Sequence, residues 1–443
     1  MSTFANRKNK ILLSDYNYRR DIENRLFMAD LTVLEVDILQ EIVNGSLKTN
    51  IHNLADNLNI SIKVLLSLLD KLGKSGLFRL QGTEILVDKE MRKYYEAQLI
   101  KFDDDFRPDM EYLIGLLNKV PIHALPTWYA LPRSSDNIFQ SIIEKFLITP
   151  KTYERYLQEL VFDNSILESI LKEVFKAPNY KIKAQTLIEK FNLTREQFEE
   201  NMLFLEFSLV CCISYNKSDN LWEEVVTPFH EWHEYLLFIQ DTNPQIIKDV
   251  TKIHPEYKHE FGFLNELNQW VSQIQKKPLA LKEIPSKILE VAKELKIVTV
   301  DKQKVSSNSL TQDWLDKNIT EQAIYLYRHI INRLLNNPDP SAFSEKDFRE
   351  IEKSLKRINH GGWVYFDDFV KGSLAAVGTT LPIYLYNKGK RWKYATPQYN
   401  EDELNYIKDV CCDYLLQTGM TSIGIHQDRL CLCLTTFGKH SIG

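Results

Sequence analysis

The order of apolar patterns between residues 31 and 87 constrains the fold of this chain more than any other feature. The segments "LTVLEVDILQEIVNG" (31–45) and "TNIHNLADNLNI" (49–60) place apolar side chains at helical spacing and predict two helices. A third helix is predicted from "SIKVLLSLLDKLGKSGLF" (61–78), where Gly73 and Gly76 end it. The next segment, "FRLQGTEILVD" (78–88), alternates around Gly82 and predicts a β-hairpin. The third helix has one broad apolar stripe, made of Ile62, Leu65, Leu66, Leu68, Leu69 and Leu72.

Three helices followed by a hairpin is the order of a winged helix-turn-helix, whose third helix usually enters the DNA major groove. The same order recurs in "SILESILKEVFK" (165–176), "KAQTLIEKFNL" (183–193) and "TREQFEENMLFLEF" (194–207), followed by two strand-like runs around "NKSDN". It recurs again between residues 344 and 439. We therefore expect a mainly α protein with small antiparallel β-hairpins, built from multiple winged helix-turn-helix units that helical connectors join.

This pattern divides the chain into seven segments, and "KKPLALKEIP" (276–285) is the strongest candidate for a domain boundary. The expected segments are a basic N-terminal arm at 1–30, a first winged helix at 31–88, a helical connector at 89–163, a second winged helix at 164–232, a second helical connector at 233–280, a helix-hairpin-helix segment at 281–343, and a third winged helix at 344–443 with a basic insertion at 379–400.

The last third of the chain, roughly residues 284–443, resembles the helicase-associated winged-helix modules of bacterial proteins and of the amino-terminal part of the eukaryotic transcription and repair helicase. The resemblance lies in "GWVYFDDFVKGSL", "LNYIKDVCCDYLLQTGMTSIG" and "RLCLCLTTFGK". The matching residues are Trp363 after a Gly-Gly turn, Gly419 before the first wing strand, and Leu434, Thr435 and Gly438 closing the second. The resemblance implies a module that lies beside a motor and binds DNA or a partner subunit.

Composition and missing motifs argue against several functions. The 443 residues contain no run of about 18–20 apolar residues, and the first residues lack an apolar run with a cleavage site. We therefore expect an intracellular, cytoplasmic protein, nucleoid-associated if it binds DNA. No G-x-x-x-x-G-K-[ST] loop, G-x-S-x-G turn or H-E-x-x-H helix occurs, so we expect no enzyme and no cofactor.

Two groups of residues were considered as metal ligands. His230 and His233 in "PFHEWHEY" are three apart on a predicted helix, but two ligands need a third and a fourth from elsewhere. A second group could converge through the last helix and hairpin, although adjacent cysteines in apolar runs more often pack in a core as reduced thiols. Its members are Cys411, Cys412, His426, Cys431 and Cys433. We expect no metal at either place.

Local charge distinguishes the three predicted third helices. Residues 61–79 have four basic side chains and one acidic one, whereas 194–207 have one basic and four acidic, and 401–417 one basic and five acidic. Because phosphates repel carboxylates, only the first helix is expected to face DNA. Its candidate contacts are Ser61, Lys63, Ser67, Lys71 and Lys74. The alternative is an ordinary solvated helix face.

The insertion "YLYNKGKRWKY" (384–394) is the other basic element. Its basic side chains could neutralise phosphates while an aromatic ring stacks on unpaired bases, although a basic hairpin turn has the same composition. The candidate contacts are Lys388, Lys390, Arg391, Trp392 and Lys393.

These patterns favour a non-enzymatic DNA-associated factor, regulatory or accessory to a helicase or to transcription, that grips DNA backbone with weak sequence specificity. A protein partner is expected as well, and no membrane. The alternative is a protein-interaction scaffold that uses winged helices for assembly, which the net charge of −5 and the acidic helices favour. A metal-dependent enzyme is a third reading, if His230 and His233 gain further ligands.

Overall fold

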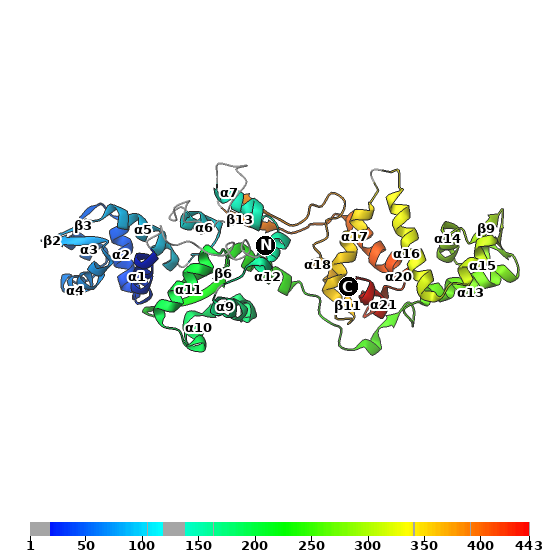
Figure 1. Cartoon of the computed structure of the whole chain (residues 1–443), viewed down its shortest axis with the longest axis horizontal. Helices are drawn as coiled ribbons and strands as arrows, with labels where there is room; N and C mark the ends of the chain where they lie inside the picture. Colours follow the sequence, from blue (N-terminus) through cyan, green and yellow to red (C-terminus); the bar gives the residue numbers. More distant parts are fainter. Residues whose placement is uncertain are drawn as a thin grey trace, which may run out of the picture. The chain divides into compact units, whose positions relative to one another are not determined.

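The computed structural model describes residues 18–103, 105–117, 138–162, 164–339, 342–389 and 391–442. The chain is mainly helical with small antiparallel sheets, as the sequence predicted. It divides into two compact units, coloured by sequence in Figure 1. Unit 1 contains Met1–Leu237 and Tyr384–Tyr394, and unit 2 contains Phe238–Ile383 and Ala395–Gly443. None of the helices in the described ranges is long and apolar enough to cross a lipid bilayer.

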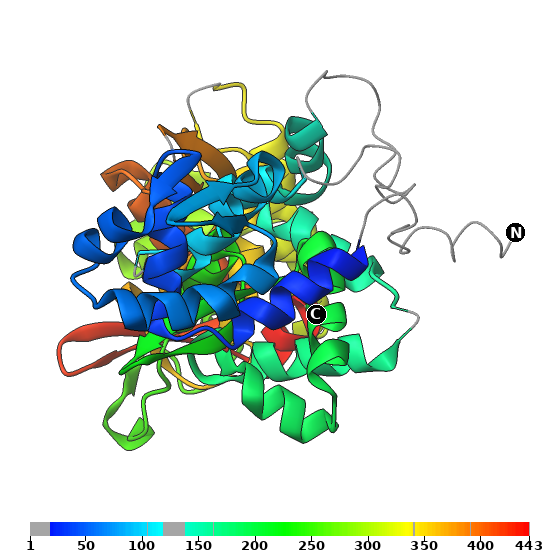
Figure 2. The ribbon, with the colours of Figure 1, turned by 90° about the vertical axis from the view of Figure 1, so that its left-hand side faces the viewer.

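The first part of unit 1 follows the predicted order. Its elements are α1 (Tyr18–Ala29), α2 (Val33–Asn44), β1 (Lys48–Asn50), α3 (Ile51–Asn57), α4 (Ile62–Leu72), β2 (Phe78–Gln81) and β3 (Glu84–Val87). Helices α2, α3 and α4 pack against one another and are coloured blue in Figures 1 and 2, beside the darker blue α1. Thr32 and Glu35 form a capping box that begins α2, and the side chains of Asn50 and Ser61 cap α3 and α4.

The rest of unit 1 repeats this order after a helical stretch. Its elements are α5 (Lys89–Leu99), α6 (Met110–Leu117), α7 (Ile138–Ile142), α8 (Pro150–Glu159), α9 (Ser165–Lys176), β4 (Ile182–Lys183), α10 (Ala184–Phe191), α11 (Arg195–Phe207), β5 (Cys211–Ser218), β6 (Leu221–Pro228) and the start of α12 (His230–Asp241). The hairpin of β12 (Tyr384–Lys388) and β13 (Arg391–Ala395) belongs to this unit through Tyr394.

Unit 2 has two further groups of helices and strands. The first comprises β7 (His254–Pro255), α13 (Gly262–Lys276), β8 (Leu279–Ala280), α14 (Ser286–Glu294), β9 (Val298–Asp301), β10 (Lys304–Ser307), α15 (Ser309–Leu315) and α16 (Ile319–Leu335). The second comprises α17 (Glu345–Ser354), β11 (Val364–Tyr365), α18 (Phe366–Lys371), α19 (Glu401–Asp409), α20 (Leu415–Gln417), β14 (Thr421–His426), β15 (Arg429–Leu434) and α21 (Thr436–Ile442). The sequence did not predict α21, because residues 436–439 were read as the end of the hairpin.

The same order of strands within a sheet occurs four times in the described ranges. A short early strand pairs with the second strand of a later hairpin, which gives the orders β1-β3-β2, β4-β6-β5, β8-β10-β9 and β11-β15-β14, the last extended by β7. The repeat around β8 was not predicted as such, because its second helix is only a 3-10 turn, Leu281–Glu283. Residues 276–285, expected to separate domains, contain β8, whose Leu279 is buried in the same core as Leu267 and Ile288.

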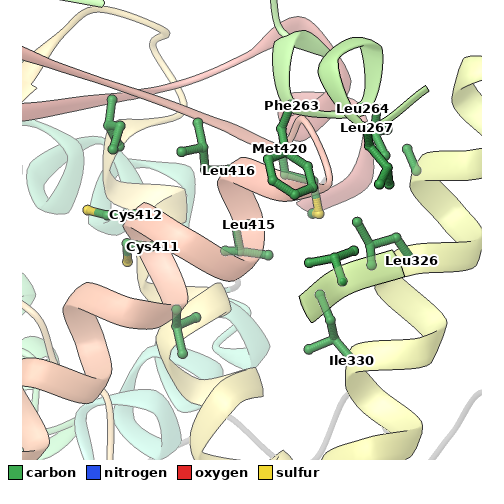
Figure 3. Packing of buried hydrophobic residues seen from close by; sticks show 14 of the residues in the cluster. Phe263, Leu264, Leu267, Leu326, Ile330, Cys411, Cys412, Leu415, Leu416 and Met420 are labelled. Carbon is green, nitrogen blue, oxygen red and sulfur yellow. The ribbon is translucent and has the colours of Figure 1, made fainter. Parts of the chain in front are cut away.

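Each unit has one large apolar cluster and a smaller one. In unit 1 the two repeats share one apolar cluster, and Phe102 stacks on Tyr215 with ring centroids 4.0 Å apart. Figure 3 shows the cluster of unit 2, where Cys411 and Cys412 lie among Leu415, Leu416 and their neighbours. All six cysteines are buried free thiols, as their apolar surroundings predicted.

Candidate interaction surfaces

Helix α4 has a narrower buried face than its sequence predicted. Leu65, Leu69 and Leu72 are buried against the core of unit 1. Ile62 and Leu66, which belong to the predicted stripe, are 38% and 43% exposed, and Val64 is 45% exposed. At about 100° per residue, Ile62 and Leu66 lie together on one flank of the buried arc, and Val64 lies on the opposite flank. The helix therefore presents aliphatic side chains to solvent.

The centre of the exposed face of α4 is polar. Lys63, Ser67 and Asp70 are exposed, and their spacing places them on one side of the helix, while Lys74 is exposed in the 3-10 turn that follows. Among the described residues, Lys63 and Lys74 form no ion pair. Two of the predicted DNA contacts also have local roles, since Ser61 Oγ accepts a hydrogen bond from Val64 N and Ser67 Oγ donates one to the Val64 carbonyl at 2.8 Å.

Lys71, also predicted to contact DNA, is held by a carboxylate of unit 1. Its Nζ lies 2.7 Å from Glu35 Oε1, and the Glu35 side chain is 3% exposed against 44% for Lys71. Burial opposes ionisation of Glu35, but hydrogen bonds from Lys71 and Thr32 outweigh it and lower the pKa of Glu35. Lys71 is therefore the counter-ion of a buried acid, which removes its charge from any ligand of α4.

In two other repeats, acidic side chains of the corresponding helices, α11 and α19, are buried. Most of α11 is buried, and Glu206 lies between Arg25 Nη2 at 2.6 Å and Lys101 Nζ at 3.3 Å. Glu206 thus has a pKa of about 2, because these two cations outweigh the effect of burial. Arg25, part of the expected basic arm, is the buried partner of this acid. In α19, Glu403 is buried and accepts hydrogen bonds from Thr379 N and Thr380 N at 2.9 and 3.0 Å. Part of the acidic charge read from the sequence is therefore internal.

The β12–β13 hairpin packs one face into unit 1. Leu385 N donates to the Ile148 carbonyl at 2.7 Å, and Tyr394 Oη donates to the Leu147 carbonyl at 2.9 Å. The Trp392 ring meets the edge of Phe139, with centroids 5.8 Å apart. The Trp392 ring is half-buried in this packing, and its stacking on nucleic-acid bases stays a prediction.

The other face of the same hairpin is basic. Strand alternation turns Arg391 and Lys393 away from the packed rings, and both are exposed, as is Lys388 at the turn. Lys393 Nζ lies 5.9 Å from the centroid of the Tyr386 ring. Lys390, the remaining predicted contact, lies outside the described residues. The structure therefore brings together three of the four predicted cations of the insertion.

The histidines of α12 form protein contacts. His230 Nε2 lies 2.9 Å from Glu234 Oε1 and 3.3 Å from Arg107 Nη1, while His233 Nε2 lies 2.7 Å from the Asn179 carbonyl. Burial lowers the pKa of both imidazoles. Over the described ranges, no three His, Cys, Asp or Glu side chains are grouped to hold a metal ion, and this includes the cysteine and His426 group.

Sequence reasoning missed two features. Glu231, at the start of α12, is 2% exposed, accepts a hydrogen bond from Met110 N at 3.0 Å and leaves Oε2 buried without a partner in the described structure. The second is a cavity of about 800 Å³ in unit 2, lined on one side by Lys258 and Lys439. No local pattern marks either feature, because their neighbours come from distant parts of the chain.

The chain matches no protein-family model, and a comparison with curated proteins gave no match.

Proposed function

We propose that this chain is a non-enzymatic assembly protein that binds another protein through the exposed face of α4. The observation that carries the proposal is the exposure of Ile62 and Leu66, which lie one turn apart on the same flank of α4. Two neighbouring exposed aliphatic side chains favour a protein surface, which can cover them, over the polar edges of bases.

The repeated topology supports a tandem winged-helix architecture. Each repeat places a short strand after its first helix, two helical segments next, and a hairpin last, which is the order of a winged helix-turn-helix. In that architecture α4 is the recognition helix of the first repeat. The likeness of residues 284–443 to helicase-associated modules belongs to the same proposal.

The side chains of α4 argue against reading DNA bases. Specific base contacts rely mostly on Arg, Asn and Gln, and residues 62–72 contain none of these. Lys71 is paired with Glu35, so the exposed cations that remain are Lys63 on α4 and Lys74 in the turn that follows it. A partner with an apolar strip beside acidic side chains would cover the aliphatic groups and meet both lysines.

The test is copurification of the tagged full chain and its partner from its source cells. Ile62→Ser with Leu66→Ser should abolish recovery of a partner while leaving thermal unfolding unchanged, because both side chains are exposed. Ile324→Ser with Leu335→Ser is the matched control, since those residues are also exposed but lie on α16. The proposal would be overturned if the partner still copurified with the α4 variant. It would also be overturned if the control variant lost the partner to the same extent.

A second candidate function is binding of the phosphate backbone of a nucleic acid. The basic face of the β12–β13 hairpin favours it. Lys388, Arg391 and Lys393 are exposed on a hairpin that the packing of Leu385 and Tyr394 holds in place. Changing the three cations to Ala should weaken binding to all DNA sequences alike and reduce the salt slope. An unchanged slope would remove this face from consideration.

A further inference from the structure

The cavity of unit 2 is lined by cationic, hydroxyl and aromatic residues. It measures about 800 Å³, which is within the size range of small-molecule sites. Lys258, His259 and Lys439 supply its basic groups, and Ser422, Thr436 and Asn265 supply neutral polar groups. Tyr257, Phe261 and Trp363 contribute partly exposed rings.

Two glycines place Lys439 at this cavity. A Cβ on Gly438 would lie 1.9 Å from the Met420 carbonyl oxygen, so glycine is needed for α21 to approach that backbone. A Cβ on Gly361 would lie 1.9 Å from Lys439 Nζ, and Gly361 has φ of +78°, which favours glycine as well. The Lys439 ammonium therefore lies over the Gly361 turn, where any other residue would displace it.

The basic groups of this cavity lack internal counter-ions. No carboxylate of the described residues lies within ion-pair distance of Lys258 or Lys439. Glu260, the carboxylate among the lining residues, accepts a hydrogen bond from Phe437 N at 3.2 Å and so helps to begin α21. An anion bound in the cavity would neutralise the charges of these two lysines.

We propose that this cavity binds a nucleotide, with its phosphate at Lys258 and Lys439 and its base against the aromatic residues of the lining. Phosphate oxygens accept hydrogen bonds from ammonium and hydroxyl groups, which Lys258, Lys439 and Thr436 provide. Bases stack on rings without regard to sequence, which Trp363 and Tyr257 allow. The nucleotide is either free or the end of a single strand, because both present this chemistry. The site is separate from α4, so it stands independently of the proposed function.

The experiment is calorimetric titration of the full chain with adenosine monophosphate and, separately, with a short oligodeoxyadenylate. Lys258→Ala with Lys439→Ala should weaken binding of either probe about 100-fold, because each charged hydrogen bond contributes about tenfold. The control is Lys282→Ala with Lys346→Ala, which removes the same charge from exposed positions of unit 2 outside the cavity and should leave affinity unchanged.

The two probes also separate the two sources of the nucleotide. Tighter binding of the monophosphate identifies a free nucleotide as the ligand, and tighter binding of the oligonucleotide identifies a strand end. Absence of heat with both probes at millimolar concentration would overturn the proposal. An equal loss of affinity in the control variant would overturn it too, because the binding would then follow total charge and not the cavity.

Discussion

The buried carboxyl group of Glu231 should make the free energy of unfolding depend on pH, and the size of this effect follows from the surroundings of the carboxyl group. Burial, with smaller contributions from Asp109 and Glu234, raises the pKa of Glu231 to about 8, from an ordinary value of 4.5. The folded chain therefore holds a proton on Glu231 that the unfolded chain releases above pH 4.5. Because the folded state binds more protons, the stability contribution of Glu231 is full below pH 4.5 and decreases until the pH passes about 8.

Glu231→Gln removes this proton linkage while keeping the shape of the side chain. One pKa unit corresponds to about 1.4 kcal/mol, so the variant should gain about 3 kcal/mol over wild type between pH 4.5 and pH 7. The measurement is urea unfolding at a series of pH values, following the transition that contains α12 by hydrogen exchange. Glu159→Gln, an exposed position of unit 1, is the control and should show no such trend. A difference between Glu231→Gln and wild type that does not change from pH 4 to pH 9 would refute the reasoning.

Two further predictions concern charges inside unit 1. Lys71→Ala should lower the free energy of unfolding by about 1–2 kcal/mol, because it leaves Glu35 buried without its cation, whereas Lys63→Ala should have no effect in the same denaturation assay. Glu206→Gln should lower it by about 3–5 kcal/mol, since Arg25 then stays buried without its main acid; a loss below about 1 kcal/mol would contradict this account.

Helices and hairpins with a long periodic signal could be predicted from the sequence. Helix α9 has the predicted bounds, and Ser61 and Thr194 cap α4 and α11 as expected. The strands β1, β4, β8 and β11 were missed, because two or three residues are too few to show alternation. They are defined only by pairing with a hairpin far along the chain, which no local pattern contains.

At the candidate sites, too, patterns within a short segment could be predicted from the sequence, whereas contacts with residues far along the chain could not. The alternation of basic and aromatic residues in 384–394 was visible, but the rings that cover Trp392 and Tyr394 come from residues 139–235. The exposure of Leu66 could not be predicted from the sequence either. An apolar residue at helical spacing does not reveal how much of the helix is covered by the elements packed against it. The role of Lys71 depends on Glu35 in the same way.

The central claim is that the exposed face of α4 binds a protein, and site-specific photo-crosslinking tests it most directly. A photoreactive amino acid would replace Leu66 in the full chain within its source cells, and Ile324 of α16 would carry it as a control, since both are exposed. The account predicts a discrete protein adduct at Leu66 that is absent at Ile324. A crosslink to nucleic acid at Leu66, or no adduct that differs from the control, would contradict it.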